Sequence, residues 1–79
     1  MARQLTRLEV AHVGSDWVVR EHGIGRLTSH VSQREATTAA RAVAAIHTPS
    51  ELTIRNEDGS VNSEESFPRM ALNRGQSRG

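Results

Sequence analysis

The chain has 79 residues, ten basic and nine acidic, and 35% of them are hydrophobic. This length allows one small domain, and an apolar content near the globular average with a net charge of +1 argues against a fully disordered chain. The lack of Cys excludes disulfides, thiolate catalysis and cysteine-based zinc sites, and an aromatic content of 3% leaves Val, Leu, Ile and Ala to fill the core.

The first part of the chain predicts three short strands. Residues 5–13 alternate partly between apolar and charged side chains, as in a half-buried strand. A turn at 14–16 is followed by the β-branched and aromatic residues 17–22, which lie at hairpin distance from the first strand. After a second, glycine-containing turn, residues 26–31 alternate weakly and predict a third strand.

One helix is predicted after these strands. Ser32 begins an S-x-x-E sequence, the capping box in which the Ser hydroxyl accepts the N–H of Glu35 and the Glu side chain bonds back to the Ser N–H. The helix runs from Gln33 to about His47 and ends before Pro49, because the residue preceding a proline disfavours the α conformation. Its predicted apolar face consists of Ala36, Ala39, Ala40, Val43, Ile46 and His47.

A second hairpin is predicted after the helix. Residues 51–55 alternate cleanly, residues 56–59 form a turn whose Gly suits a positive φ, and residues 60–67 are extended again. The predicted fold class is α+β: an antiparallel sheet of four to five strands with one helix packed on one face, in the order ββ(β)αββ. Residues 1–67 form this single domain, and residues 68–79 are expected to be a flexible basic C-terminal tail.

Three sequence features occur together in a fixed order. They are W-V-V-R-E-H-G at 17–23, S-Q-R-E-A at 32–36 with A-A-R-A-V-A at 39–44, and E-L-T-I-R-N-E-D-G-S-V at 51–61 with a closing E-S-F at 65–67. Together they resemble domain-of-unknown-function family 2188, a small bacterial and phage family. Its pattern is a W-x-V-x-x-E-G strand and turn, an Ala-rich T-x-x-E-A helix and L-x-I-x-x-x-D-G. The resemblance covers roughly residues 10–67.

The resemblance implies a strand-strand-helix-strand-strand arrangement and brings no activity with it. It implies structural roles for Trp17 as an anchor of the core or sheet face, for Glu35 as a cap and for Asp58-Gly59 as a turn. Departures from the family pattern leave the implied fold unchanged; they are Ser32 for the usual Thr, an inserted His22 and Phe67 for the frequent Tyr.

No arrangement of residues in the sequence points to catalysis. The four His residues lack the spacing that places two imidazoles on one metal, and Gly23-Ile24-Gly25 lacks the third glycine and the following helix of a dinucleotide site. The adjacent carboxylates of Glu64 and Glu65 point to opposite faces of a strand, and Ser29-His30 lacks a nucleophile elbow. The sequence predicts neither an enzyme nor a metal or other cofactor.

The first functional hypothesis is a non-catalytic protein-interaction or regulatory module, in a phage or accessory bacterial protein. A domain this small buries little surface by itself, so we expect a homo-oligomer, most simply a dimer. One helix covers only one face of the sheet, and apolar side chains on the other face would need a protein partner. The expected interface residues are Val18, Leu27, Val31 and Val61.

The alternative is a sequence-tolerant nucleic-acid-binding protein. All ten basic residues are Arg, whose guanidinium groups suit phosphate contacts, although a GC-rich genome explains the same bias. The near-neutral net charge and the lack of an aromatic ladder count against it. The candidate contact residues are Arg20, Arg26, Arg34, Arg41, Arg69, Arg74 and Arg78. No apolar run has the length of a signal peptide or membrane span, so a cytoplasmic location without membrane contact is expected.

Overall fold

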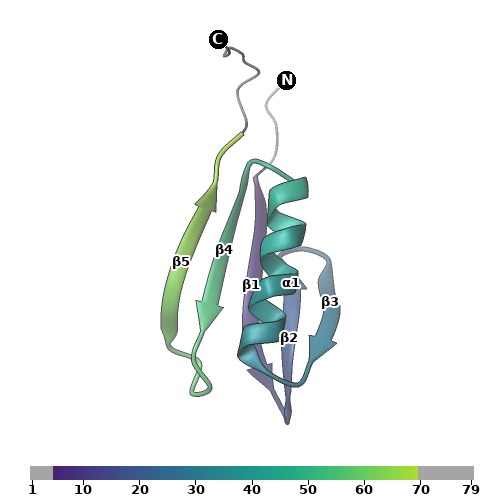
Figure 1. Cartoon of the computed structure of the whole chain (residues 1–79), viewed down its shortest axis with the longest axis vertical. Helices are drawn as coiled ribbons and strands as arrows, with labels where there is room; N and C mark the ends of the chain where they lie inside the picture. Colours follow the sequence, from purple (N-terminus) through teal and green to yellow (C-terminus); the bar gives the residue numbers. More distant parts are fainter. Residues whose placement is uncertain (1–4, 70–79) are drawn as a thin grey trace.

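The computed structural model describes residues 5–69 of the chain. In chain order they form β1 (Thr6–Val13), β2 (Asp16–Glu21), β3 (Gly25–His30), α1 (Gln33–Ile46), β4 (Ser50–Arg55) and β5 (Val61–Phe67) (Figure 1). Every predicted strand and the predicted helix are present, with each end within one residue of its predicted position. The α+β class and the ββ(β)αββ order are confirmed. Of the predicted tail, residues 70–79 lie outside the described residues.

The five strands form one sheet in the spatial order β3-β2-β1-β4-β5. The pairs β1–β2, β2–β3 and β4–β5 are antiparallel, while the central pair β1–β4 is parallel. This parallel pair is the one difference from the predicted antiparallel sheet. It arises because α1 carries the chain back along the sheet, so that β4 begins at the same end as β3 and β1 (Figure 1).

The core lies between α1 and one face of the sheet. The sheet contributes five aliphatic side chains and the helix three alanines, all at most 5% exposed: Leu8, Val10, Val19, Leu52, Ile54, Ala36, Ala40 and Ala44. The alanines allow the helix to lie close to the strands because a methyl group takes little space. Trp17 packs partly buried against this core, which agrees with the anchoring role implied for it.

The buried stripe of α1 differs from the predicted apolar face at its C-terminal end. Ile46 is 76% exposed, and His47 is exposed as well. The buried residues Ala36, Ala40 and Ala44 are spaced four apart, and at about 100° per residue Ile46 lies about 120° around the helix from Ala40. The prediction that Ile46 and His47 face the core is therefore wrong.

Both ends of α1 are fixed by hydrogen bonds. The Ser32 hydroxyl accepts a bond from the Glu35 backbone N–H at 3.1 Å, which confirms Ser32 as the N-cap. The predicted return bond from the Ser32 N–H to the Glu35 side chain is not among the hydrogen bonds of residues 5–69. Beyond the other end, the buried Ser50 hydroxyl donates to the Ala44 carbonyl at 2.7 Å and ties the last turn to β4.

The part of the chain that the structure describes contains no helix with the length and hydropathy of a membrane span.

The β4–β5 turn has the chemistry that the sequence predicts. Gly59 has a φ of 93°, a conformation that other residues rarely adopt. Asp58 accepts hydrogen bonds from the hydroxyl and the backbone N–H of Ser60 at 2.6 and 2.9 Å, and these bonds lower the pKa of the Asp58 carboxyl. Gly59 and the Asp58–Ser60 hydrogen bonds therefore hold the turn that connects β4 to β5 in one conformation.

Candidate interaction surfaces

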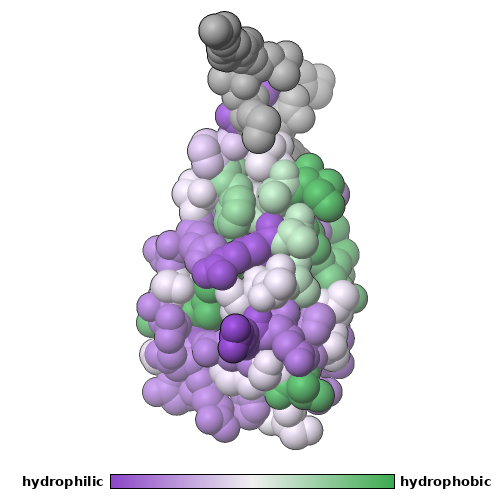
Figure 2. Space-filling view, viewed as in Figure 1, coloured by the Kyte–Doolittle hydropathy of each residue, from purple (hydrophilic) through white to green (hydrophobic). Residues whose placement is uncertain are grey.

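The edge strand β3 is the most exposed strand of the sheet. Five of its six residues are exposed, and it lies between Ile24, 70% exposed, and Val31, 79% exposed. Figure 2 shows hydrophobic surface mainly toward α1 and β3, and hydrophilic surface over β5. Because β3 pairs with β2 alone, its outer backbone groups are available to another strand, beside two exposed apolar side chains.

A bulge interrupts the pairing of β3 with β2. Thr28 lies opposite Val19 and Arg26 lies opposite Arg20, so Leu27 is the additional residue. Val19 faces α1 as part of the core, so Thr28 shares that face, whereas Arg26 shares the opposite face with Arg20. We refer to the sheet face away from α1 as the open face.

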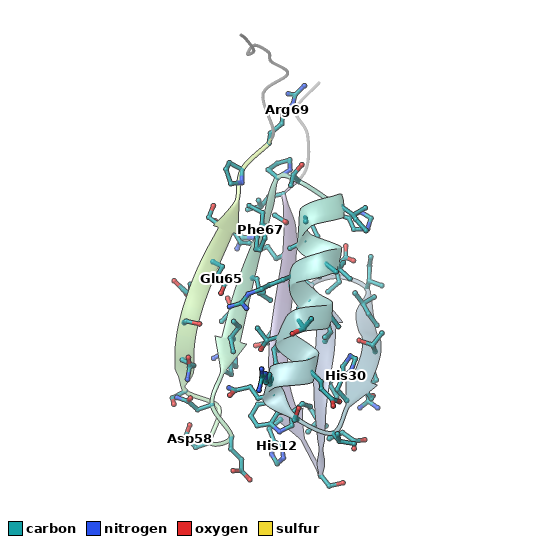
Figure 3. All side chains as sticks on the ribbon, viewed as in Figure 1. His12, His30, Asp58, Glu65, Phe67 and Arg69 are labelled. Atoms are coloured by element: carbon teal, nitrogen blue, oxygen red, sulfur yellow. The ribbon has the colours of Figure 1, made fainter. Side chains whose placement is uncertain are left out.

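The opposite edge strand, β5, is acidic. It contains Glu64 and Glu65 and has no basic residue. Arg41 on α1 donates from Nε to Glu65 Oε1 at 2.9 Å and from Nη2 to Oε2, and Figure 3 shows Glu65 on the side of β5 toward the helix. These hydrogen bonds lower the pKa of Glu65 and raise the pKa of Arg41. The helix and β5 are thereby linked by a bidentate ion pair.

Charged side chains cross the middle of the open face. Arg20 Nη2 donates to Glu9 Oε1 at 2.8 Å, and Arg55 Nε donates to Glu9 Oε2, which joins β2, β1 and β4. Partial burial by itself raises the pKa of Glu9, but the hydrogen bonds and charges of the two guanidinium groups outweigh it and hold that pKa below 4.5. The centre of this face is polar rather than apolar.

The predicted interface residues do not form one apolar patch. Val18 lies on the open face but is 0% exposed, so it offers no surface to a partner. Val61, 49% exposed, lies on β5 at the far edge of the sheet. Leu27, 37% exposed, and Val31 are brought together at the β3 edge. The open face thus carries Val18 and Val61, as expected of some of these residues, but the cross-strand ion pairs occupy its centre and separate them.

The predicted nucleic-acid contacts are distributed over separate parts of the molecule. Arg20 and Arg26 lie side by side on the open face, whereas Arg34 and Arg41 lie on α1, which covers the other face. Arg69 follows β5 at the end of the molecule opposite His12 and Asp58 (Figure 3). Arg74 and Arg78 lie outside the described residues. The structure thus brings together Arg20 and Arg26, and it joins Arg20 and Arg41 to carboxylates.

Two of the four histidines, His12 and His30, have side-chain contacts within the described residues. The ring of His12 lies 4.8 Å from that of Trp17, and its Nδ1 is 3.9 Å from Glu57 Oε2. His30 Nε2 is 2.8 Å from the Thr28 hydroxyl. Among residues 5–69 no three His, Asp or Glu side chains are grouped so as to hold a metal ion.

Two features of these surfaces were missed by sequence reasoning. The exposure of Ile24 has a local signal, because Ile24 lies in the predicted turn between Gly23 and Gly25 and turns run over the protein surface. The bond of Glu9 to Arg55 joins residues 46 positions apart, and only the parallel β1–β4 pairing brings them together. Local spacing carries no signal of such a contact.

Comparison with known proteins identifies the family of the chain. No curated protein and no solved structure matched it at the threshold of the comparison. A family model described as an uncharacterised protein conserved in bacteria matches residues 9–67, which include all but the first part of the folded region and agree with the resemblance noted from the sequence. The chain therefore belongs to this bacterial family, DUF2188.

Proposed function

We propose that the protein is a non-catalytic protein-interaction module that acts as a homo-oligomer in the cytoplasm, with the β3 edge as its binding surface. The observation that carries the proposal is an exposed edge strand bounded by the exposed apolar residues Ile24 and Val31. A strand from a protein partner, added to this edge, would satisfy its outer backbone groups and cover both side chains.

The partners of the polar side chains support binding rather than catalysis. Glu9 accepts hydrogen bonds from two guanidinium groups, Glu65 accepts two from Arg41, and His30 bonds with Thr28. A general acid, base or nucleophile must reach a substrate atom at hydrogen-bond distance. Side chains already held by one another in this way are better suited to stabilising strands than to proton transfer.

The proposal predicts that a charge at either end of β3 weakens self-association. Ile24→Lys and Val31→Lys would each leave a cation in the contact, and we expect roughly a tenfold or greater increase in the dissociation constant, since desolvating an unpaired charge costs well over 1.4 kcal/mol. Sedimentation equilibrium measures this change. Circular dichroism checks that each variant is folded, as expected for substitutions at exposed positions.

Ile46→Lys is the matched control. Ile46 is as exposed as the other two side chains, at 76%, but lies at the end of α1. It should therefore leave the dissociation constant unchanged. Equal effects of all three substitutions, or no effect of Ile24→Lys and Val31→Lys, would contradict a binding surface at β3.

The nucleic-acid alternative has one observation in its favour. Arg20 and Arg26 lie opposite each other on the open face, an arrangement of like charges that an anion would stabilise. Fluorescence anisotropy with labelled DNA and RNA at low and moderate salt tests it. Binding that collapses with salt and weakens in Arg26→Ala would favour this alternative. Such binding would not weaken in Val31→Lys, which separates the two functions.

A further inference from the structure

The two free edges of the sheet differ in their ability to pair with themselves. An antiparallel pair of β5 strands would bring Glu64 and Glu65 of one copy against the same residues of the other, and directly opposed like charges are destabilising. In contrast, β3 contains no acidic residue and one basic residue, Arg26. Self-pairing is therefore favoured at β3 and opposed at β5.

The bulge in β3 restricts the register of such a pair. Arg26 faces the open side with Arg20, and Ser29 faces it with Val18, whereas Gly25 and His30 lie on the side of α1. Side chains directly opposite each other in an antiparallel pair share one face. In a regular strand, residues on the same face are an even number of positions apart. The bulge adds one residue between Arg26 and Thr28, so a residue before the bulge shares its face with residues after it that are an odd number of positions away, as Arg26 does with Ser29.

We infer that a second copy of this chain binds the β3 edge, with the two β3 strands antiparallel about a two-fold axis through the bulge. Arg26 of one copy then lies opposite Ser29 of the other, and Gly25 lies opposite His30. The inference rests on the proposed function and adds its partner and register. The five-stranded sheet continues into its copy, and both helices lie on one face of the joined sheet.

This register also suits the charges and the apolar ends of the strand. Each Arg26 faces a neutral Ser29 rather than the other Arg26. Ile24, just before β3, comes next to Val31 of the second copy, just after it, so two of the most exposed apolar side chains cover each other at both ends of the contact. A shift of one residue would place Arg26 opposite Thr28 or His30, which face the other side of the sheet.

Single cysteines test the register directly, because the natural chain has no Cys. Arg26→Cys and Ser29→Cys proteins carrying tags of different mass are mixed and mildly oxidised. We expect the mixed disulfide dimer in about tenfold excess over either symmetric dimer, because Cβ atoms of opposite residues lie about 4.5–5.5 Å apart while positions three residues away lie about 10 Å apart.

Ser66→Cys is the matched control. Ser66 is an exposed serine on the open face of the other edge strand, so it should form no disulfide with Arg26→Cys. Cross-linking of Ser66→Cys with Arg26→Cys would show head-to-tail pairing of β3 with β5 and would overturn the inference. A predominance of either symmetric dimer would also overturn it.

The two proposals fail in different ways. If Ile24→Lys and Val31→Lys weaken self-association but the mixed disulfide is absent, the inferred register is wrong and β3 remains the binding surface. If the natural chain is monomeric at every concentration in sedimentation equilibrium, the second copy is not the partner, and the inference is overturned together with the homo-oligomer. If the natural chain self-associates but neither substitution affects it, the proposed surface is wrong.

Discussion

At the scale of single residues, Glu9 connects three strands through two guanidinium groups. Its side chain is 27% exposed, while those of Arg20 and Arg55 are 42% and 35% exposed. The ion pairs are thus partly in water, and each is weaker than a fully buried pair would be. Their main effect is to fill the centre of the open face with charge, which keeps that face from being an apolar docking surface.

The ionisation of Glu9 predicts a loss of stability in acid. Its folded-state pKa lies below the ordinary value of 4.5, so the ionised carboxylate adds stability that is fully present above about pH 4.5 and is lost as the pH falls through the folded-state value. Glu9→Gln should cost about 1 kcal/mol at neutral pH, because both guanidinium groups keep some water contact. Urea unfolding followed over a pH series measures both effects.

The free energy of unfolding of Glu9→Gln should also fall less in acid than that of the natural chain. Glu64→Gln provides the comparison, because Glu64 is an exposed carboxylate on the open face of β5. If Glu9→Gln and Glu64→Gln have the same neutral-pH stability and the same acid dependence, the hydrogen bonds of Glu9 to Arg20 and Arg55 contribute nothing measurable.

At the scale of elements, the alanine stripe sets the distance between α1 and the sheet. Ala40 is fully buried in the core cluster that also contains Val10 and Val19, whereas Ala42 is exposed on the same helix. Ala40→Leu should destabilise the fold by about 1–3 kcal/mol, because the added carbons force the helix away from the strands. Thermal and urea unfolding measure the change.

The same substitution at Ala42 supplies the control. Ala42→Leu adds the same carbons on the solvent side and retains a good helix former, so its effect should stay within about 0.5 kcal/mol. Similar losses for Ala40→Leu and Ala42→Leu would mean that close packing of α1 on the sheet does not limit the stability.

The elements could be predicted from sequence because their signals are local. The Ser32 cap, the Gly59 turn and the alternation of residues 51–55 each depend on neighbours in the chain, and the structure has all three. The predicted burial of Ile46 is wrong for a related reason. Periodicity identifies a wide apolar stripe on a helix, with residues along both of its sides. Only the position of the helix over the sheet decides which side is buried.

At the scale of the whole molecule, strand order could not be predicted from local signals. Placing β4 beside β1 makes β3 and β5 the edges, and it brings Arg55 to Glu9. The same order explains why the predicted interface residues Val18 and Val61 are not joined with Val31. Residue types alone indicate apolar content, whereas the order of strands decides which of those residues reach the surface together.

The proposed binding surface, the edge strand β3, requires no pocket. Its bulge, its exposed ends and its lack of acidic residues together distinguish it from β5, whose carboxylates oppose self-pairing. The central claim is therefore that β3 is the edge that receives a partner strand, and that a second copy of the chain supplies it.

Amide hydrogen exchange at several protein concentrations tests this claim most directly. In the monomer the outer N–H groups of β3 exchange freely with water, and pairing with another strand protects them. We predict that protection of amides in Gly25–His30 rises with protein concentration while that of amides in Val61–Phe67 does not change. Concentration-independent exchange in β3, or protection that rises in β5 instead, would contradict the account.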